Sequence, residues 1–292
     1  MKQLFLRGIV LSSLMFFVSN CKKDSSAGSG DSGFDINLST SATLGQYLTN
    51  NHGQALYMFA DDVDGVSSCT GACAALWPAF TADLTNAKLN ANLNAADFAT
   101  ITNGDGKKQV TYRGWPLYTY SPSGSGGYGN TVNIPEGTGS TKGDGFGGIW
   151  FVAKTDYTIM LADKQFKGLD GNNYKGDYTT GNGKTIYFTD GAGRTIYTFS
   201  ADSFNLNKFT KPDLSNNNVF PVYEQEQAVT PSILDKSQFG NITVAGKKQM
   251  TYKGWPLYFF GKDSVRGLNL AVSFPVPGKW PVAVKDIPDP KR

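Results

Sequence analysis

The sequence predicts an all-β protein with two tandem homologous modules of short antiparallel strands and hairpins and few short helices. The segment 107–118 (KKQVTYRGWPLY) recurs 140 residues later as 247–258 (KKQMTYKGWPLY), which indicates an internal duplication. Aromatic and β-branched residues alternate in short runs bounded by Gly, Asn or Asp, which is typical of strands and hairpins. Apolar residues with helical spacing are scarce. This pattern fits either a small barrel or a sandwich in each module.

The composition indicates a folded protein and excludes several functional classes. Hydrophobic residues make up 40% and aromatic residues 13% of the 292 residues, which is enough to bury a core. The 27 basic and 24 acidic residues are too evenly balanced for a nucleic-acid binder. A single histidine excludes a multi-histidine metal site and most histidine-based catalysis. We therefore expect no nucleic-acid partner, no cofactor and no resident metal.

Residues 1–20 have the layout of a bacterial signal peptide. Lys2 and Arg7 precede an apolar run, 9–18, that is too short to span a bilayer. The run ends just before Cys21 and resembles a lipobox, which implies cleavage before this cysteine and attachment of lipid to it. An ordinary secretory signal with an incidental thiol is the alternative. The sequence thus predicts a lipoprotein of the bacterial cell envelope, most simply in the outer membrane and facing the periplasm or the surface.

The duplication sets the expected domain boundaries. Besides the repeat already described, residues 47–62 align with 187–202 at the same offset. The segment after Cys21 is rich in Ser and Gly, which is typical of a flexible tether. The expected parts are the signal peptide 1–20, the lipidated cysteine and tether 21–43, the first module 44–162, a linker 163–177, and the second module 178–287.

Within each module, local signals predict the elements in order. Two hairpins are expected around Arg113-Gly114 and around Lys253-Gly254, because strand-like residues flank each turn. Short helices are expected at 89–98 and at 232–239, the second with Ser232 as its cap. Residues 121–148, rich in Gly, Ser and Asn, predict a long loop without strands, either functional or simply mobile.

Four copies of one short motif carry a family resemblance. Three copies have the form Tyr-x-(Phe/Trp/Tyr)-x-x-Asp, and the fourth, Tyr118-x-Tyr120, ends in Ser123 instead of Asp. The complete copies are Tyr57, Phe59 and Asp62; Tyr197, Phe199 and Asp202; and Tyr258, Phe260 and Asp263. Together with Trp77-Pro78 and the Gly-Trp-Pro-Leu-Tyr segments, they make nearly all of 44–287 resemble the bacterial secreted-repeat lipoproteins. That family is of unknown function, so the resemblance implies a location rather than a chemistry.

The motif itself suggests a structural role. A Tyr and an aromatic residue two positions later point to the same face of a strand, so we expect them to pack in the core. The Asp that follows lies where the strand ends, and its carboxylate can accept backbone N–H bonds and close a turn. The alternative is that these carboxylates bind calcium or a substrate.

Cys69 and Cys73 form the sharpest local feature. If Cys21 carries lipid, they are the only remaining thiols in an oxidising compartment, where a pair of cysteines usually forms a disulfide. The alternative is a redox or copper(I) site, because thiolates suit Cu(I), with His52 as the only histidine available to complete it. The second module contains no cysteine, so the repeat architecture does not require the pair.

Four aromatic residues near the hairpin turns are candidates for ligand binding: Tyr112, Trp115, Tyr252 and Trp255. Exposed rings at these positions would stack on sugars or bind a protein partner, whereas buried ones would belong to the core. The sequence therefore predicts a lipid-anchored, non-enzymatic binding or structural module, with an envelope protein or a glycan as its partner. The alternatives are a redox or copper-handling accessory that uses Cys69 and Cys73, and a glycan-binding protein. An enzyme is not expected, although a substrate site in a β protein needs no linear motif.

Overall fold

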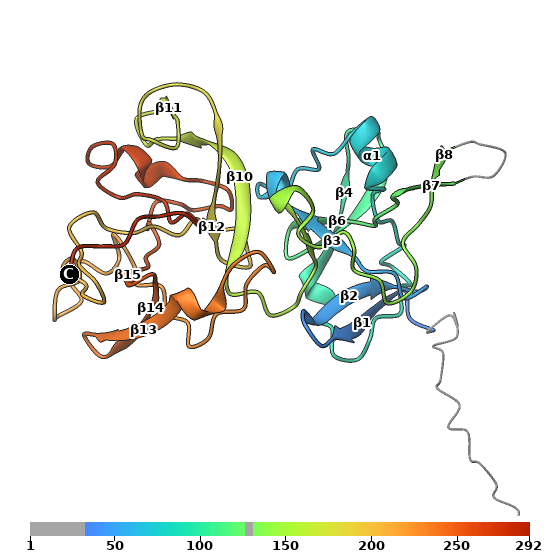
Figure 1. Ribbon diagram of the computed structural model, residues 1–292, viewed down its shortest axis with the longest axis horizontal. Coiled ribbons are helices and arrows are strands. Elements are labelled where there is room, and N and C mark those ends of the chain that lie inside the picture. The colour runs from blue at the N-terminus through green and yellow to red at the C-terminus, as the bar shows by residue number, and fades with distance from the viewer. Residues whose placement is uncertain (1–32, 126–130) are drawn as a thin grey trace, which may run out of the picture. The chain divides into compact units, whose positions relative to one another are not determined.

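The computed structural model confirms the all-β fold and its short antiparallel strands (Figure 1). It describes residues 33–125 and 131–292, so the predicted signal peptide and Cys21 lie outside the described residues. Within the described part, helical structure is limited to one short α-helix and five single 3-10 turns. These are α1 (Ala72–Leu76), η1 (Ala60–Asp62), η2 (Ala95–Asp97), η3 (Phe146–Gly148), η4 (Lys236–Gln238) and η5 (Leu270–Ser273).

The first repeat, which we define as residues 36–153, is centred on a five-stranded antiparallel sheet with the order β4-β5-β6-β3-β9. Its strands are β3 (Tyr57–Phe59), β4 (Phe98–Thr102), β5 (Lys108–Tyr112), β6 (Trp115–Tyr118) and β9 (Trp150–Val152). A separate two-stranded ladder consists of β1 (Ile36–Ser41) and β2 (Gly45–Asn50). In the central sheet Tyr57 pairs with Tyr118 on one side and with Val152 on the other.

The second repeat, residues 160–283, follows the same plan. Strands β13, β14 and β15 form one sheet, and single bridges from Tyr197 to Tyr258 and to Val282 extend it in the same order as in the first repeat. These strands are β13 (Phe239–Val244), β14 (Lys247–Tyr252) and β15 (Trp255–Pro256). A ladder of β10 (Met160–Lys167) and β12 (Lys184–Thr189) corresponds to β1 and β2, with β11 (Asn173–Tyr174) added at its edge. The two modules are therefore homologous in structure as well as in sequence.

Each repeat begins one strand earlier than the sequence indicates. Strand β1, at 36–41, lies inside the segment predicted to be a tether, and β10, at 160–167, crosses the predicted boundary between module and linker. Both strands are held by backbone pairing to the strand that opens the predicted module. Four of the six residues of β1 are polar, so its strand signal in the sequence is weak, although Ile36 is buried in the core and Leu38 packs against it.

Two further expectations need correction. The segments 89–98 and 232–239 contain only the single turns η2 and η4, because Asn94 and Asp235 accept the N–H two residues ahead and favour a turn over a longer helix. Asp235, rather than Ser232, is the cap of the second. The predicted loop 121–148 contains a small hairpin of β7 (Ser123–Ser125) and β8 (Thr131–Asn133), and also η3.

Stacked aromatic rings fill the core of both repeats at equivalent places. In the first repeat Trp150 stacks on Trp77, with ring centres 3.9 Å apart, and on Phe59, at 4.0 Å. In the second repeat Trp280 stacks in the same way on Phe220, at 3.4 Å, and on Phe199, at 4.4 Å. These stacked rings remove a large apolar area from water in each repeat.

Candidate functional site

The carboxylates that end the first motif of each repeat are buried and fully engaged. Asp62 accepts bonds from the backbone N–H of Ser68 at 2.9 Å and from the hydroxyl of Tyr118 at 2.5 Å. Asp202 does the same with Lys208 N–H at 2.7 Å and the Tyr258 hydroxyl at 2.7 Å. Each side chain therefore bonds the loop after its strand to a tyrosine of the sheet.

Each repeat has a second buried carboxylate of the same kind, but the two repeats supply it from different positions in the sequence. In the second repeat Asp263 accepts from Leu270 N–H at 3.0 Å and from the Tyr197 hydroxyl at 2.6 Å. In the first repeat the motif position is Ser123, and the carboxylate comes from Glu136. Its Oε2 accepts the Tyr57 hydroxyl at 2.5 Å, and its Oε1 accepts the Lys142 N–H. Sequence analysis missed Glu136, although it is the only acidic residue between Asp105 and Asp144.

The four tyrosine–carboxylate pairs are crossed within each repeat. The tyrosine of one motif donates to the acid of the other, and the reverse also holds. The crossing follows from the strand pairing, because Tyr57 lies opposite Tyr118 and Tyr197 lies opposite Tyr258. A strand end of one motif therefore lies within reach of the other motif's ring.

Burial changes the acidity of these groups. It raises the pKa of Asp62 and of Asp202 to about 6 and that of Asp263 to about 7, although the hydrogen bonds that they accept act in the opposite direction. Burial, reinforced by the neighbouring acids, raises the pKa of Tyr118 and Tyr258 as well. The tyrosines thus stay protonated as donors, and the three Asp side chains take up protons in mildly acidic solution.

Cys69, in the loop before α1, and Cys73, within α1, form a disulfide with an S–S distance of 2.03 Å. His52 lies in the turn after β2, where its backbone oxygen accepts the Thr138 hydroxyl at 2.7 Å. In residues 33–125 and 131–292, no three His, Cys, Asp or Glu side chains form a group that could hold a metal ion.

Three of the four candidate ligand-binding aromatics lie in the core. Trp115 is 0% exposed, and Tyr112 and Tyr252 are each 2% exposed, so none presents a ring face to solvent. Only Trp255 is partly exposed. Tyr112 packs against Phe98 and Tyr252 against Phe239 of the same repeat, whereas the segments that cover the two tryptophans differ between the repeats.

In the first repeat, the hairpin turn 113–115 is covered by the second repeat. The indole N–H of Trp115 donates to the carbonyl oxygen of Gly191 at 3.0 Å. The guanidinium of Arg266 lies 4.7 Å from the centre of the Trp115 ring, donates to Arg113 O at 2.7 Å through Nη1, and donates to Val63 O through Nε. Burial lowers the pKa of Arg266 to about 10, which still leaves it charged at neutral pH.

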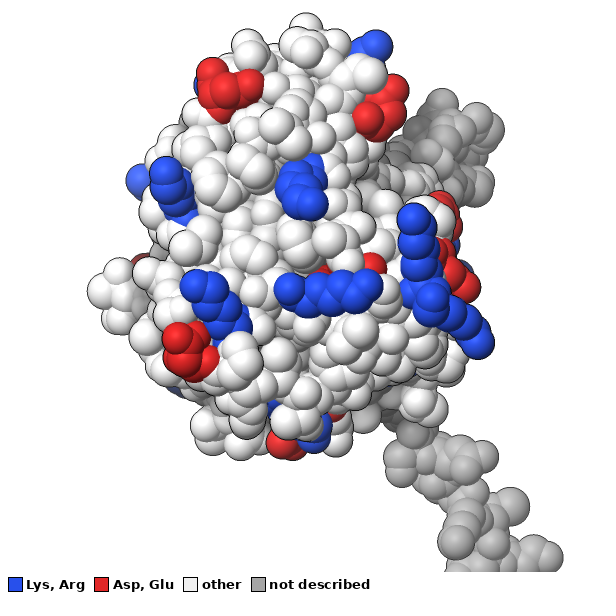
Figure 2. All heavy atoms as spheres, turned by 90° about the vertical axis from the view of Figure 1, so that its left-hand side faces the viewer, with Lys and Arg blue, Asp and Glu red and all other residues white. Residues whose placement is uncertain are grey.

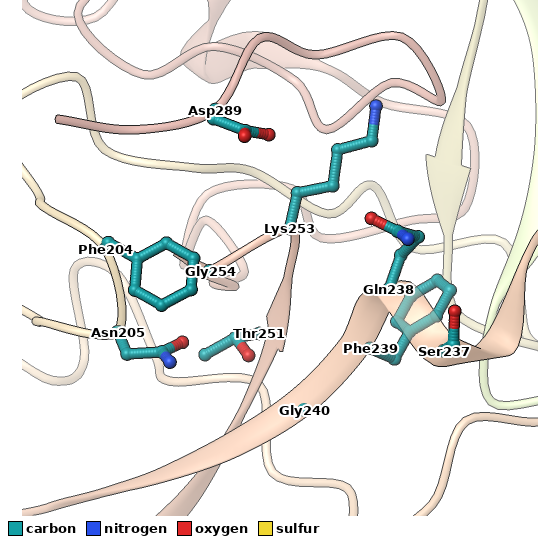
Figure 3. Close-up of a pocket in the computed structure, with 10 residues that line it drawn as sticks. All are labelled: Phe204, Asn205, Ser237, Gln238, Phe239, Gly240, Thr251, Lys253, Gly254 and Asp289. Carbon is teal, nitrogen blue, oxygen red and sulfur yellow. The ribbon is translucent and has the colours of Figure 1, made fainter. Parts of the chain in front are cut away.

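In the second repeat, the equivalent turn 253–255 is covered by residues 285–292. The Trp255 indole N–H donates to Pro288 O at 2.7 Å, and the Lys253 amine donates to Ile287 O at 3.3 Å. A pocket of about 240 Å³ remains beside this turn. Figure 3 shows Phe204 and Asn205 on one side of it and Gln238 and Phe239 on the other. Its remaining lining residues are Ser237, Gly240, Thr251, Lys253, Gly254 and Asp289.

The charged side chains are dispersed over the face drawn in Figure 2. Lys and Arg side chains are spread across it with uncharged surface between most of them, and a few acidic groups lie among them. This face offers no continuous basic surface to a polyanion.

Two homologous sheets, each closed by crossed tyrosine–carboxylate pairs, define a tandem β-repeat protein. Three regions of the chain, 39–81, 99–122 and 242–283, match the model of a family described as a secreted repeat of unknown function. The resemblance to the secreted-repeat family is thereby confirmed for these three regions. No curated protein and no solved structure matches the chain.

The family description agrees with an extracytoplasmic location, since it names a secreted repeat. None of the helices in the described residues is long and apolar enough to span a bilayer.

Proposed function

We propose that this chain is a non-enzymatic binding or structural module of the bacterial cell envelope, attached to the membrane through lipid on Cys21. The observation that carries the proposal is the crossed arrangement of the motif side chains. The carboxylates of Asp62, Asp202, Asp263 and Glu136, the most chemically capable groups of the repeat, are buried and bonded to tyrosines of their own repeat. A catalytic or ligand-binding acid would instead face a cleft with a coordination position free.

The bonded state of Cys69 and Cys73 supports a structural role for this pair as well. A copper-handling role would require the disulfide to be reduced first, because the thiolate is the metal ligand. A glycan that binds at the 253–255 turn would meet the pocket beside Phe204. The Phe204 ring packs over Gly254, and the guanidinium carbon of Arg292 lies 5.1 Å from the ring centre. These contacts favour a packing role for the ring.

The anchor is tested by fractionation of cells that produce the natural chain or the Cys21→Ser variant. We expect the natural chain in the membrane fraction with the added mass of a lipid by intact mass spectrometry, and the variant in the soluble extracytoplasmic fraction. A Cys69→Ser/Cys73→Ser variant is the matched control and should stay with the membrane. A natural chain without added mass, released like the variant, would refute the anchor.

A further inference from the structure

The contact between the two repeats joins one face of each. We call residues 63–65 and 113–115 the downstream face of the first repeat, and the turn 190–194 with Arg266 the upstream face of the second. Besides the bonds of Arg266 and Trp115 already described, Gly193 packs against Val63 O, where an added Cβ would lie at 3.2 Å. Each repeat also has the other of these two faces, which does not take part in this contact. The downstream face of the second repeat consists of 203–205 and 253–255, and the upstream face of the first repeat contains the turn 50–54.

The outer upstream face has the same backbone design but a shorter side chain. In the second repeat Gly267 N–H donates to Gly193 O at 2.9 Å, and in the first repeat Gly139 N–H donates to Gly53 O at 3.1 Å. The residue before each donor is Arg266 in one case and Thr138 in the other. Thr138 of the first repeat therefore occupies the position equivalent to Arg266 of the second, and its side chain is too short to extend into a neighbouring repeat.

At the outer downstream face, by contrast, the side chain is larger than its counterpart at the inner contact. Phe204 occupies the position that aligns with Asp64 of the first repeat. Its ring lies over Gly254 and leaves no room for a Cβ there, and the Arg266 guanidinium lies over Gly114 in the same way. Phe204 thus fills, from its own repeat, the place that Arg266 fills from the next repeat.

The two outer faces are complementary to each other for this reason. At the inner contact a long Arg266 enters a place left open by Asp64 and Gly65. At the outer faces a large Phe204 fills that place, and a short Thr138 leaves room for it. We propose that copies of this chain associate head to tail, with the 50–54 turn of one copy docked on the 253–255 hairpin of the next.

In the single chain this hairpin is covered by residues 285–292, of which 288–292 make the contacts with Trp255 and Phe204. Pro288 O accepts the indole N–H of Trp255, just as Gly191 O accepts that of Trp115. The backbone N–H of Phe204 donates to Lys291 O at 2.9 Å. In the associated form Asn51 O of the second copy, which aligns with Gly191, takes the place of Pro288 O. The cover is part of the same chain and competes at a high effective concentration. Association at a membrane, where anchored copies are concentrated, rests on the proposed lipid anchor, but the docking itself does not.

The test is sedimentation velocity of the full mature chain carrying Cys21→Ser, so that lipid does not drive association. We expect a concentration-dependent dimer and higher species, and deletion of 288–292 should lower the dissociation constant by about tenfold or more because the competitor is gone. Monomers up to about 1 mM, both with and without 288–292 and with unchanged circular dichroism, would overturn the proposal.

A pair of substitutions at exposed positions tests the geometry in the chain that lacks 288–292. Thr138→Arg and Phe204→Asp should each weaken association by about tenfold, since one creates a clash and the other leaves a void. The double variant recreates the Arg266–Asp64 combination and should recover most of the affinity. Additive losses would overturn the proposed contact, whatever the outcome of the lipid-anchor experiment.

Discussion

The two repeats supply their second carboxylate in different ways. In the second repeat Asp263 follows its motif tyrosine directly, whereas in the first repeat a hairpin intervenes and Glu136 restores the acid after it. Both carboxylates accept a buried tyrosine hydroxyl and a backbone N–H several residues downstream. The comparison teaches that the architecture requires a carboxylate at one point in space, not an Asp at one point in the sequence.

Substitution of these two acids tests most directly whether the two repeats are equivalent at this point. Glu136→Ala and Asp263→Ala should each lower the free energy of unfolding by about 3 kcal/mol, because each leaves a buried tyrosine hydroxyl and an N–H without an acceptor. Urea denaturation measures both. Ser123→Ala, at the motif position that Glu136 replaces, is the control and should change stability by less than about 0.5 kcal/mol. A harmless Glu136→Ala would show that the two repeats are not equivalent here.

Arg266 and Phe204, which lie over the two equivalent hairpin turns, should contribute different amounts to the free energy of unfolding. Arg266→Ala removes two hydrogen bonds and the contact with Trp115 across the repeats, so we expect a loss of about 2–3 kcal/mol and earlier unfolding of one repeat. Phe204→Ala, at a side chain 41% exposed, should cost about 1 kcal/mol. Equal losses, measured by denaturation followed through Trp fluorescence, would contradict the assignment of Arg266 as the inter-repeat contact.

Only the first repeat has a disulfide, so its removal should destabilise the first repeat. Cys69→Ser/Cys73→Ser should lower stability by about 2 kcal/mol, as expected for a bond that closes a very short loop. Alkylation and intact mass of the mature protein, purified without reductant, should detect no free thiol at these positions. Two thiols that react before reduction would instead favour the redox or copper-handling alternative.

The smallest effect concerns pH. Burial raises the pKa of Asp263 to about 7, well above the value of about 3.9 in an unfolded chain. Its contribution to stability is therefore complete below about pH 4 and is lost as the pH rises through 7. Between pH 6 and pH 8 we expect stability to fall by about 1 kcal/mol through Asp263. Asp263→Asn should reduce this slope, whereas Asp83→Asn, at an exposed side chain, should leave it unchanged.

The sequence predicted the fold class and the duplication well because both depend on local and repeated patterns. In the first repeat the Trp-Pro-Leu-Tyr segment and the Tyr57-x-Phe59 alternation mark the strands β6 and β3, whereas in the second repeat the equivalent segments form a two-residue strand and single bridges. It failed at β1, where four of the six residues are polar and only Ile36 and Leu38 contact the core. The backbone pairing of β1 with β2 leaves no further pattern in the sequence.

The candidate site was less predictable, because its contacts cross long stretches of chain. Glu136 pairs with Tyr57, 79 residues away, and Arg266 contacts Val63 from 203 residues away. The aromatics at the hairpin turns have the composition of a sugar-binding surface, but the segments that cover them are far away in the sequence. Burial of Trp115 could therefore not be inferred from its neighbours.

The crossed pairs also limit how such a protein can grow or shrink. A complete motif contains a tyrosine and an acid that do not pair with each other, since each finds its partner in the other half of the repeat. An event that copied or deleted one motif would leave both groups buried without partners. The smallest unit that evolution can add to this chain, or an engineer can remove from it, is thus a pair of motifs, which is the unit that the 140-residue duplication has copied.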